Sequence, residues 1–253
     1  MNLHRGFKVK LKRNIFIYKV NEKKNFIKEK IKTYKKIFSF KKKIIFIRTP
    51  RSGSTFLTNF LKLIEPKIKY KFFYSSHYSN LDFIIGRSKY ILIVRNPIRR
   101  FYSAFYYLKA RKVGTYYHKN HEIWKKFKDI NELCENLSDE NYSKEANKFI
   151  YCSHHISRSL SQQYSIDKLK KYQPYFVFEL EDLKNDINHF LTKNNIVFDI
   201  SLFNTIENKD KNLFYKNFNL SQKSKKNLEI LLKKDIEIYN YLVKNKFKIN
   251  NAK

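Results

Sequence analysis

Short apolar runs recur along the chain, and most are followed by a stretch with helical periodicity. Four runs have the length and the aromatic or β-branched content of buried strands: residues 44–47, 70–74, 90–94 and 175–178. Helical patterns cover 55–64, 98–110 and 181–193, and Pro97 suits the first turn of the second helix. Strands that alternate with helices predict an α/β domain with a central, mainly parallel sheet flanked by helices.

The remaining helical signals lie in two longer segments. Residues 121–165 are expected to be mainly helical. Over 221–244 the apolar spacing predicts one long amphipathic helix, whose stripe comprises Leu228, Leu231, Leu232, Ile236 and Tyr239. We interpret this stripe as core packing rather than as a partner-binding surface.

The composition is strongly basic. The 253 residues include 54 Lys and Arg against 22 Asp and Glu, which gives a net charge of +32. The lysines are spread over the whole length among Asn, Ile, Phe and Tyr, a mixture typical of an AT-rich coding sequence, and no nucleic-acid reader motif is present. The apolar content of 42%, with 23 Phe and 19 Tyr, excludes a disordered chain. We therefore expect a folded domain with no specific nucleic-acid partner.

Cysteine usage and the N-terminal segment bear on location. Cys134 and Cys152 are too few for a disulfide framework and match no zinc ligand set, so we expect a reducing compartment and no metal. Residues 1–42 form a basic extension before a domain at 43–253, without a signal peptide or a run of the ~20 apolar residues that a membrane span needs. The expectation is a cytoplasmic protein. Residues 1–43 form either a solvated arm or a peripheral contact with anionic membrane.

The first chemical motif follows the strand at 44–47. The segment Thr49-Pro50-Arg51-Ser52-Gly53-Ser54 leads directly into a helix, where Gly53 permits close backbone approach and Ser54 and Thr55 offer hydroxyls and free N–H groups. This arrangement predicts a phosphate-binding loop, although an ordinary polar turn is the alternative. It is not a Walker A motif, because the Gly-Lys-Ser/Thr ending is absent.

The second motif follows the strand at 90–94. Arg95-Asn96-Pro97 opens a helix on which Arg100 and Ser103 share a face. Ligands of open α/β sheets collect at the carboxyl ends of the strands. Arg95 and Ser103 are therefore expected to meet around a single phosphate, and the two motifs together predict a nucleotide with two separated phosphate groups.

These two motifs resemble those of the sulfotransferases that use 3′-phosphoadenosine 5′-phosphosulfate (PAPS). Residues 50–57 look like the 5′-phosphosulfate loop, and the stretch from Arg95 to Ser103 is similar to the 3′-phosphate motif. The sequence of this second motif is closest to that of the carbohydrate branch. The resemblance is weaker at 178–183 and 235–239 and covers about residues 43–244.

The resemblance implies a single P-loop-like three-layer domain. It also implies transfer of a sulfuryl group from PAPS to the hydroxyl of a saccharide or glycolipid, with no metal. Residues of the loop would hold the 5′ end of the donor: Arg51, Ser52, Gly53, Ser54, Thr55 and Phe56. Arg95 and Ser103 would bind its 3′-phosphate. Arg51 stands where many relatives have Lys; it can stabilise the leaving oxygen but not donate a proton.

An acceptor hydroxyl also needs a general base. His77, after the strand at 70–74, is the expected base, with His154 and His155 as rivals by resemblance and Glu179 and Glu181 as further candidates. His118, His121 and Trp124 are interpreted as variable surface, and Lys209 and Lys211 as a weak candidate for a loop over the nucleotide. The alternative functions are a P-loop kinase that uses ATP and a basic nucleic-acid-binding protein.

Overall fold

The structure of the protein is a computed structural model with a parallel sheet at its centre. The structure describes residues 43–77, 81, 89–110, 127–137, 146, 150, 154–157, 159–199 and 219–252. The described strands are β1 (Lys43–Ile47), β2 (Lys71–Tyr74), β3 (Lys89–Val94) and β4 (Phe176–Glu179). They pair in the order β2-β1-β3-β4, and every pairing is parallel. The predicted parallel sheet is confirmed, with the four predicted runs as its strands.

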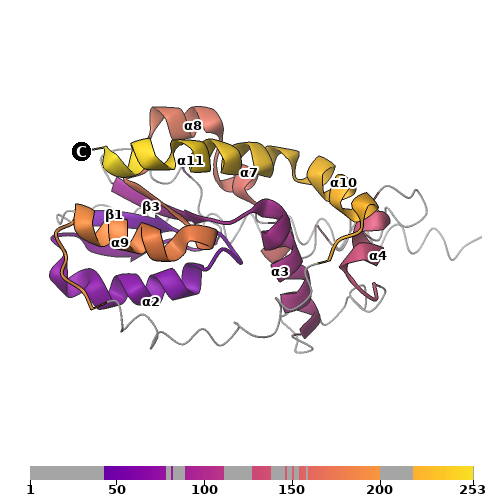
Figure 1. Ribbon diagram of the computed structural model, residues 1–253, viewed down its shortest axis with the longest axis horizontal. Coiled ribbons are helices and arrows are strands. Elements are labelled where there is room, and N and C mark those ends of the chain that lie inside the picture. Colours follow the sequence, from indigo (N-terminus) through magenta and orange to yellow (C-terminus); the bar gives the residue numbers. More distant parts are fainter. Residues whose placement is uncertain are drawn as a thin grey trace, which may run out of the picture. The chain divides into compact units, whose positions relative to one another are not determined.

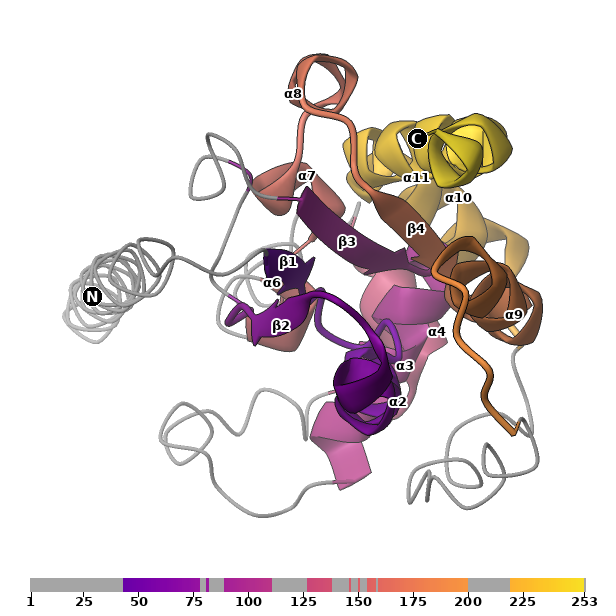
Figure 2. The same cartoon turned by 90° about the vertical axis from the view of Figure 1, so that its left-hand side faces the viewer.

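Helices cover both faces of this sheet. Figure 1 shows α2 (Ser54–Ile64) and α9 (Leu183–Lys193) on one side and α11 (Lys233–Asn251) on the other. Figure 2, turned by 90°, shows α7 (Leu160–Gln163) and α8 (Ile166–Lys171) on the side of α11. The three-layer α/β architecture follows from the strands, since β1 is buried along its whole length and must be covered on both faces.

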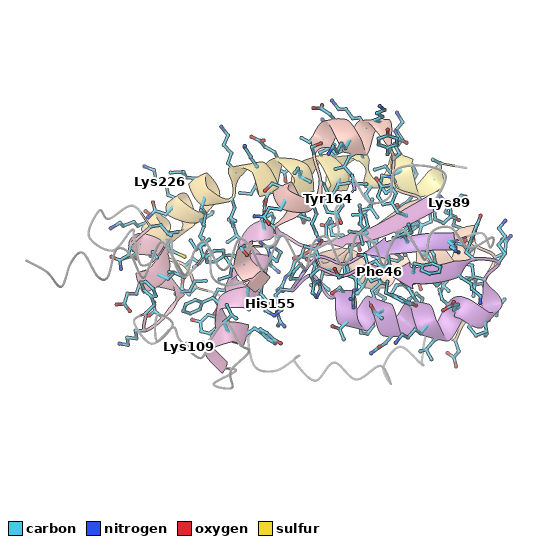
Figure 3. The ribbon with its side chains drawn as sticks, turned by 180° about the vertical axis from the view of Figure 1, so that it is seen from behind. Phe46, Lys89, Lys109, His155, Tyr164 and Lys226 are labelled. Carbon is cyan, nitrogen blue, oxygen red and sulfur yellow. The ribbon has the colours of Figure 1, made fainter. Side chains whose placement is uncertain are left out.

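Alternation along the strands selects which side chains face α2 and α9. Ile44 and Phe46 of β1, Ile91 and Ile93 of β3, and Phe176 and Phe178 of β4 share one core with the apolar stripes of both helices. Figure 3 shows Phe46 among the side chains of the sheet. Because successive side chains of a strand point to opposite faces, Ile45 and Leu92 are directed to the other layer, where they are equally buried.

A second core lies around α3 (Pro97–Ala110), which leaves the carboxyl end of β3. Phe101 and Phe105 of α3 pack with Leu133 of α4 (Ile130–Glu135) and Leu228 of α10 (Gln222–Leu231). The short α6 (His154–Ser157) contributes Ile156 to the same core. Two 3₁₀ turns complete the described elements, η1 (Glu65–Lys67) and η4 (Leu180–Asp182).

The prediction of one long helix over 221–244 is wrong. The chain instead forms α10 and α11, separated at Leu232, whose ψ of 12° departs from helical geometry. Leu228 and Leu232 are buried as predicted, but Leu231 is 41% exposed and does not belong to the buried stripe. In the described part of 121–165, the prediction of helix holds only for short segments.

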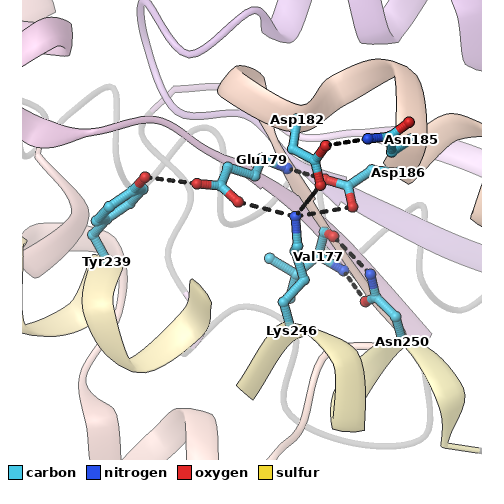
Figure 4. Close-up of polar contacts among 8 residues, drawn as sticks. All are labelled: Val177, Glu179, Asp182, Asn185, Asp186, Tyr239, Lys246 and Asn250. Carbon is cyan, nitrogen blue, oxygen red and sulfur yellow. Dashed lines mark hydrogen bonds and ion pairs between the residues drawn. The ribbon is translucent and has the colours of Figure 1, made fainter. Parts of the chain in front are cut away.

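The C-terminal helix α11 closes the outer edge of β4, as Figure 4 shows. The backbone N–H of Val177 donates to Asn250 Oδ1 over 2.8 Å, and Asn250 Nδ2 donates back to the Val177 carbonyl over 3.0 Å. A side-chain amide thus replaces the next strand, which leaves the backbone of this residue satisfied on its outer side.

A lysine of α11 also fixes the carboxyl end of β4. Lys246 Nζ lies 2.9 Å from Glu179 Oε2, 2.8 Å from Asp182 Oδ2 and 3.1 Å from Asp186 Oδ1. Tyr239 donates to the other Glu179 oxygen over 2.7 Å (Figure 4). These contacts raise the pKa of Lys246 against the effect of burial, and they hold the β4–α9 connection beside the end of β3.

No helix of the described ranges has the length and apolar character to cross a membrane. Residues 1–42, with the predicted arm or membrane contact, lie outside the described residues.

Candidate functional site

The loop between β1 and α2 has a left-handed backbone at two positions. Arg51 and Gly53 both have positive φ values, 60° and 78°. A Cβ on Gly53 would lie 2.6 Å from Leu180 Cδ1. The position therefore favours glycine both because its φ is positive and because Leu180, where it lies, leaves no room for a side chain. Leu57 N–H donates to the Gly53 carbonyl, which starts α2 and directs the first amides of the helix into the loop.

Arg51 connects the two motifs. Arg95 Nη1 donates to the Arg51 carbonyl over 3.0 Å, and Arg51 Nε and Nη2 each lie 3.4 Å from Ser103 Oγ. The guanidinium carbon of Arg51 stacks 4.0 Å from the ring centroid of Tyr107 in α3. The structure brings both Arg95 and Ser103 to Arg51, and their meeting around a single phosphate stays a prediction.

The start of α3 is set by Asn96. Its Oδ1 accepts from the N–H groups of Ile98 and Arg99 over 3.1 and 3.2 Å, a side-chain cap that leaves Pro97 at the first helical position as predicted. Arg95, just before this cap, is 4% exposed, and its Nε lies 4.0 Å from Glu181 Oε1. Burial raises the pKa of Glu181, and the Arg95 guanidinium acts in the opposite direction.

The other predicted loop residues have distinct environments. Ser52 is fully buried, and its hydroxyl has no hydrogen-bond partner among the described residues. Ser54 is buried, and its carbonyl accepts from Thr58, whereas Thr55 is exposed. Phe56 packs into the core between α2 and the sheet, so only its backbone is available to a ligand.

His77 follows β2 at the same sheet edge. Its Nδ1 lies 3.1 Å from the carbonyl of Arg48. A carbonyl only accepts, so Nδ1 carries the proton and Nε2 of the neutral ring is left as an acceptor. Burial lowers the pKa of His77 below its ordinary value of 6.5, the hydrogen bond to the Arg48 carbonyl opposes this shift in part, and the positive charge of Arg48 adds to it. The ring is thus held in the neutral form that can accept a proton.

The rival histidine His155 is a neighbour of His77. Their ring centroids are 6.4 Å apart, and the His155 ring lies edge-on to Tyr107 at 4.9 Å. Figure 3 shows His155 on α6, beside α3. The aromatic contacts therefore run from Tyr107, under the Arg51 guanidinium, through His155 to His77. His154 begins α6, and its side chain lies outside the described part.

Gln163 of α7 is a site residue that the sequence reasoning missed. Its Oε1 accepts from Thr49 Oγ1 over 2.7 Å, and its Nε2 donates to the carbonyls of Arg48 and His77 over 3.2 and 3.4 Å. The buried amide therefore ties the start of the loop to the backbone of His77. A glutamine in a polar stretch carries no local signal, since its partner Thr49 lies 114 residues away in the sequence.

Glu179, a further candidate for the base, is engaged by other side chains. Both carboxylate oxygens of Glu179 are engaged by Tyr239 and Lys246, an arrangement that favours a structural role over that of a base. His118, His121, Trp124, Lys209 and Lys211 lie outside the described residues. A surface hollow lined by Lys62, Glu65 and Tyr70 lies where α2 ends, at the opposite end of that helix from the loop.

Comparisons of the chain with protein-family models, curated proteins and solved structures found no match.

Proposed function

We propose that the protein is a PAPS-dependent sulfotransferase that transfers a sulfuryl group to a hydroxyl of a saccharide or glycolipid. The observation that carries the proposal is the junction at Arg51: its carbonyl accepts from Arg95 while its guanidinium reaches Ser103. Two sequence motifs that suit two separate phosphates thus meet at the carboxyl ends of the adjacent strands β1 and β3.

The donor would bind along this edge. The amides at the start of α2 and the buried Ser52 hydroxyl would bind its 5′ phosphosulfate, because both offer hydrogen-bond donors without a helical partner. Arg95 and Ser103 would bind its 3′-phosphate through a charge-assisted bond and a hydroxyl. The two contacts from Arg51 to Ser103 are long at 3.4 Å, so an anionic oxygen can readily take the place of this hydroxyl at the guanidinium.

The chemistry follows from the protonation states. The acceptor oxygen forms a bond to sulfur as the bond from sulfur to the bridging phosphate oxygen breaks, and the acceptor proton passes to Nε2 of His77. Negative charge then develops on the departing oxygen of adenosine 3′,5′-bisphosphate, where Arg51 supplies a fixed positive charge. Arg51 does not give up a proton, so the departing phosphate leaves as an anion.

Nucleotide binding provides the first test. Adenosine 3′,5′-bisphosphate is expected to raise the melting temperature of the protein, and ATP with magnesium is not. Arg95→Ala should weaken bisphosphate binding by about 10–100-fold, the value of one or two lost charge-assisted hydrogen bonds. Arg99→Ala, which removes an exposed charge from the same motif, is the matched control and should bind like the wild type.

The same experiment separates the alternatives. Stabilisation by ATP with magnesium but not by the bisphosphate would favour a kinase. Tight, salt-sensitive binding of random oligonucleotides without a response to the bisphosphate would favour a nucleic-acid-binding protein.

Turnover provides the second test. Radiolabelled PAPS incubated with panels of glycans and glycolipids should yield a labelled product that identifies the acceptor. His77→Gln should bind the bisphosphate normally but lose turnover, because the base no longer takes the acceptor proton. His155→Gln is the comparison variant, and loss of turnover in His155→Gln alone would transfer the base role to His155.

A further inference from the structure

Arg100 belongs to the second motif, yet its surroundings differ from those of Arg51 and Arg95. Its side chain is fully buried. Nη1 donates to the carbonyl of His155 over 3.0 Å and Nη2 to that of Ile156 over 3.2 Å. Nη2 also lies 3.8 Å from Asp235 Oδ2 of α11. One guanidinium therefore joins α3, α6 and α11.

The helix α6 is too short to be stable without contacts to the rest of the domain. α6 has four residues, too few for a stable isolated helix, and the carbonyls of such a short segment lack helical partners. The planar guanidinium satisfies two of these carbonyls at once, which a single ammonium group does less well. Burial lowers the pKa of Arg100, and the Asp235 carboxylate opposes that shift. The Arg100 guanidinium therefore remains charged inside the domain.

The position of α6 matters because of His155. Its ring lies against Tyr107 at 4.9 Å and His77 at 6.4 Å between centroids. We infer that Arg100 is a positioning residue, which holds α6 so that the His155 ring stays against His77 and Tyr107, and that it is not a phosphate ligand. The inference rests on the proposed function, because its kinetic consequence requires His77 to act as the base.

Loss of the two hydrogen bonds from Arg100 to α6 should therefore affect His77 indirectly, through the position of His155. Among the described residues, the charged and titratable groups that face His77 are Arg48, whose carbonyl accepts from its ring, and His155 on α6. If α6 moves, water replaces the His155 ring, and the pKa of His77 should rise toward 6.5. The base is also displaced, and a shift of about 1 Å can cost about 10²-fold in rate.

Two variants isolate the carbonyl contacts from the buried charge pair. Asp235→Asn removes the charge partner but leaves both carbonyl bonds of Arg100, and its amide oxygen can still accept from Ser161 N–H, now 3.0 Å from Asp235 Oδ1. The double variant Arg100→Met/Asp235→Asn removes the guanidinium without leaving a buried charge alone. The comparison between these two variants, both full-length, is the test.

The readouts are bisphosphate affinity, kcat and the NMR titration of the His77 ring, whose signal is assigned by its loss in His77→Gln. Relative to Asp235→Asn, the double variant should bind the bisphosphate within about twofold, lose about 10²-fold in kcat and titrate His77 at a higher pH. Arg100→Lys keeps the positive charge but replaces the planar guanidinium by a single ammonium group, and it should show a smaller His77 shift and a smaller loss of kcat than the double variant.

Two results would overturn the inference. One is a folded double variant with the kcat and the His77 titration of Asp235→Asn; if the double variant does not fold, the same result in Arg100→Lys, compared with the wild type, counts. The other is a bisphosphate affinity lowered tenfold or more with an unchanged His77 signal, which would make Arg100 a phosphate ligand. If the wild type binds no bisphosphate, the proposed function fails, and the NMR titration still tests the role of Arg100 separately.

Discussion

Substitution of Gly53 by alanine tests the left-handed conformation of the loop between β1 and α2. The residue has φ of 78°, and a Cβ at this position would lie 2.6 Å from Leu180 Cδ1, 3.4 Å from Ile93 Cδ1 and 3.7 Å from Leu180 Cδ2. The change adds a single methyl group and introduces no charge. Its effect therefore reports backbone strain and one close contact.

Three contributions determine the expected change in the free energy of unfolding. The left-handed backbone costs an alanine about 1–2 kcal/mol. Leu180 is only partly buried and can rotate away, at about 0.5–1.5 kcal/mol if it leaves its rotamer well. Alanine also restricts the unfolded chain, which returns about 0.4–1 kcal/mol. We expect a net loss of about 2 kcal/mol in the free energy of unfolding, or roughly 4–8 °C in melting temperature.

Urea unfolding of four proteins divides this loss into its parts: wild type, Gly53→Ala, Leu180→Ala and the double variant. If the close contact contributes, the double variant should be more stable than the sum of the single effects predicts, by about 0.5–1.5 kcal/mol. Asn195→Gly serves as a control, because it places glycine where Gly53→Ala removes it. Asn195 has φ of 52° at the exposed end of α9, so glycine there should be neutral or slightly stabilising.

Two outcomes would contradict the reasoning. A free energy of unfolding for Gly53→Ala within about 0.5 kcal/mol of wild type would mean that the loop is not left-handed at this position. Strict additivity in the cycle would mean that Leu180 does not approach the loop, and the whole cost would then lie in the backbone.

Three further predictions concern α11 and the candidate base. Lys246→Met should cost about 3 kcal/mol at neutral pH, because it leaves three carboxylates together without their cation; Lys248→Met, on the same helix but exposed, is the urea-denaturation control. Asn250→Leu should cost about 2–4 kcal/mol in the same assay, because both backbone groups of the buried Val177 lose their partner. The lowered pKa of His77 places the acid limb of kcat below pH 6.5. The unfolded chain binds the proton more readily, so stability should rise with pH between the lowered pKa and 6.5, and His77→Gln should abolish that rise in pH-dependent melting curves.

Local patterns were sufficient to predict the framework. Continuous apolar runs identify strands that are covered on both faces, and alternation of such runs with helical periodicity leads to a parallel sheet. The carboxyl ends of parallel strands share one edge, so the two loops after β1 and β3 were expected to be neighbours, and Arg51 and Arg95 are hydrogen-bonded there. All of this depends on contacts within a few residues or on the direction of the strands.

The roles of individual side chains depend on contacts between distant parts of the chain. Gln163 of α7 contacts Thr49 of the loop, and His155 of α6 contacts His77, and both contacts join segments that are far apart in the sequence. In a chain with 54 Lys and Arg, nothing local distinguishes Lys246, between three carboxylates, from Lys248, which is exposed. Hydrophobic periodicity encodes which face of an element is buried. The partner of a buried polar group is decided by where the folded chain brings another element beside it.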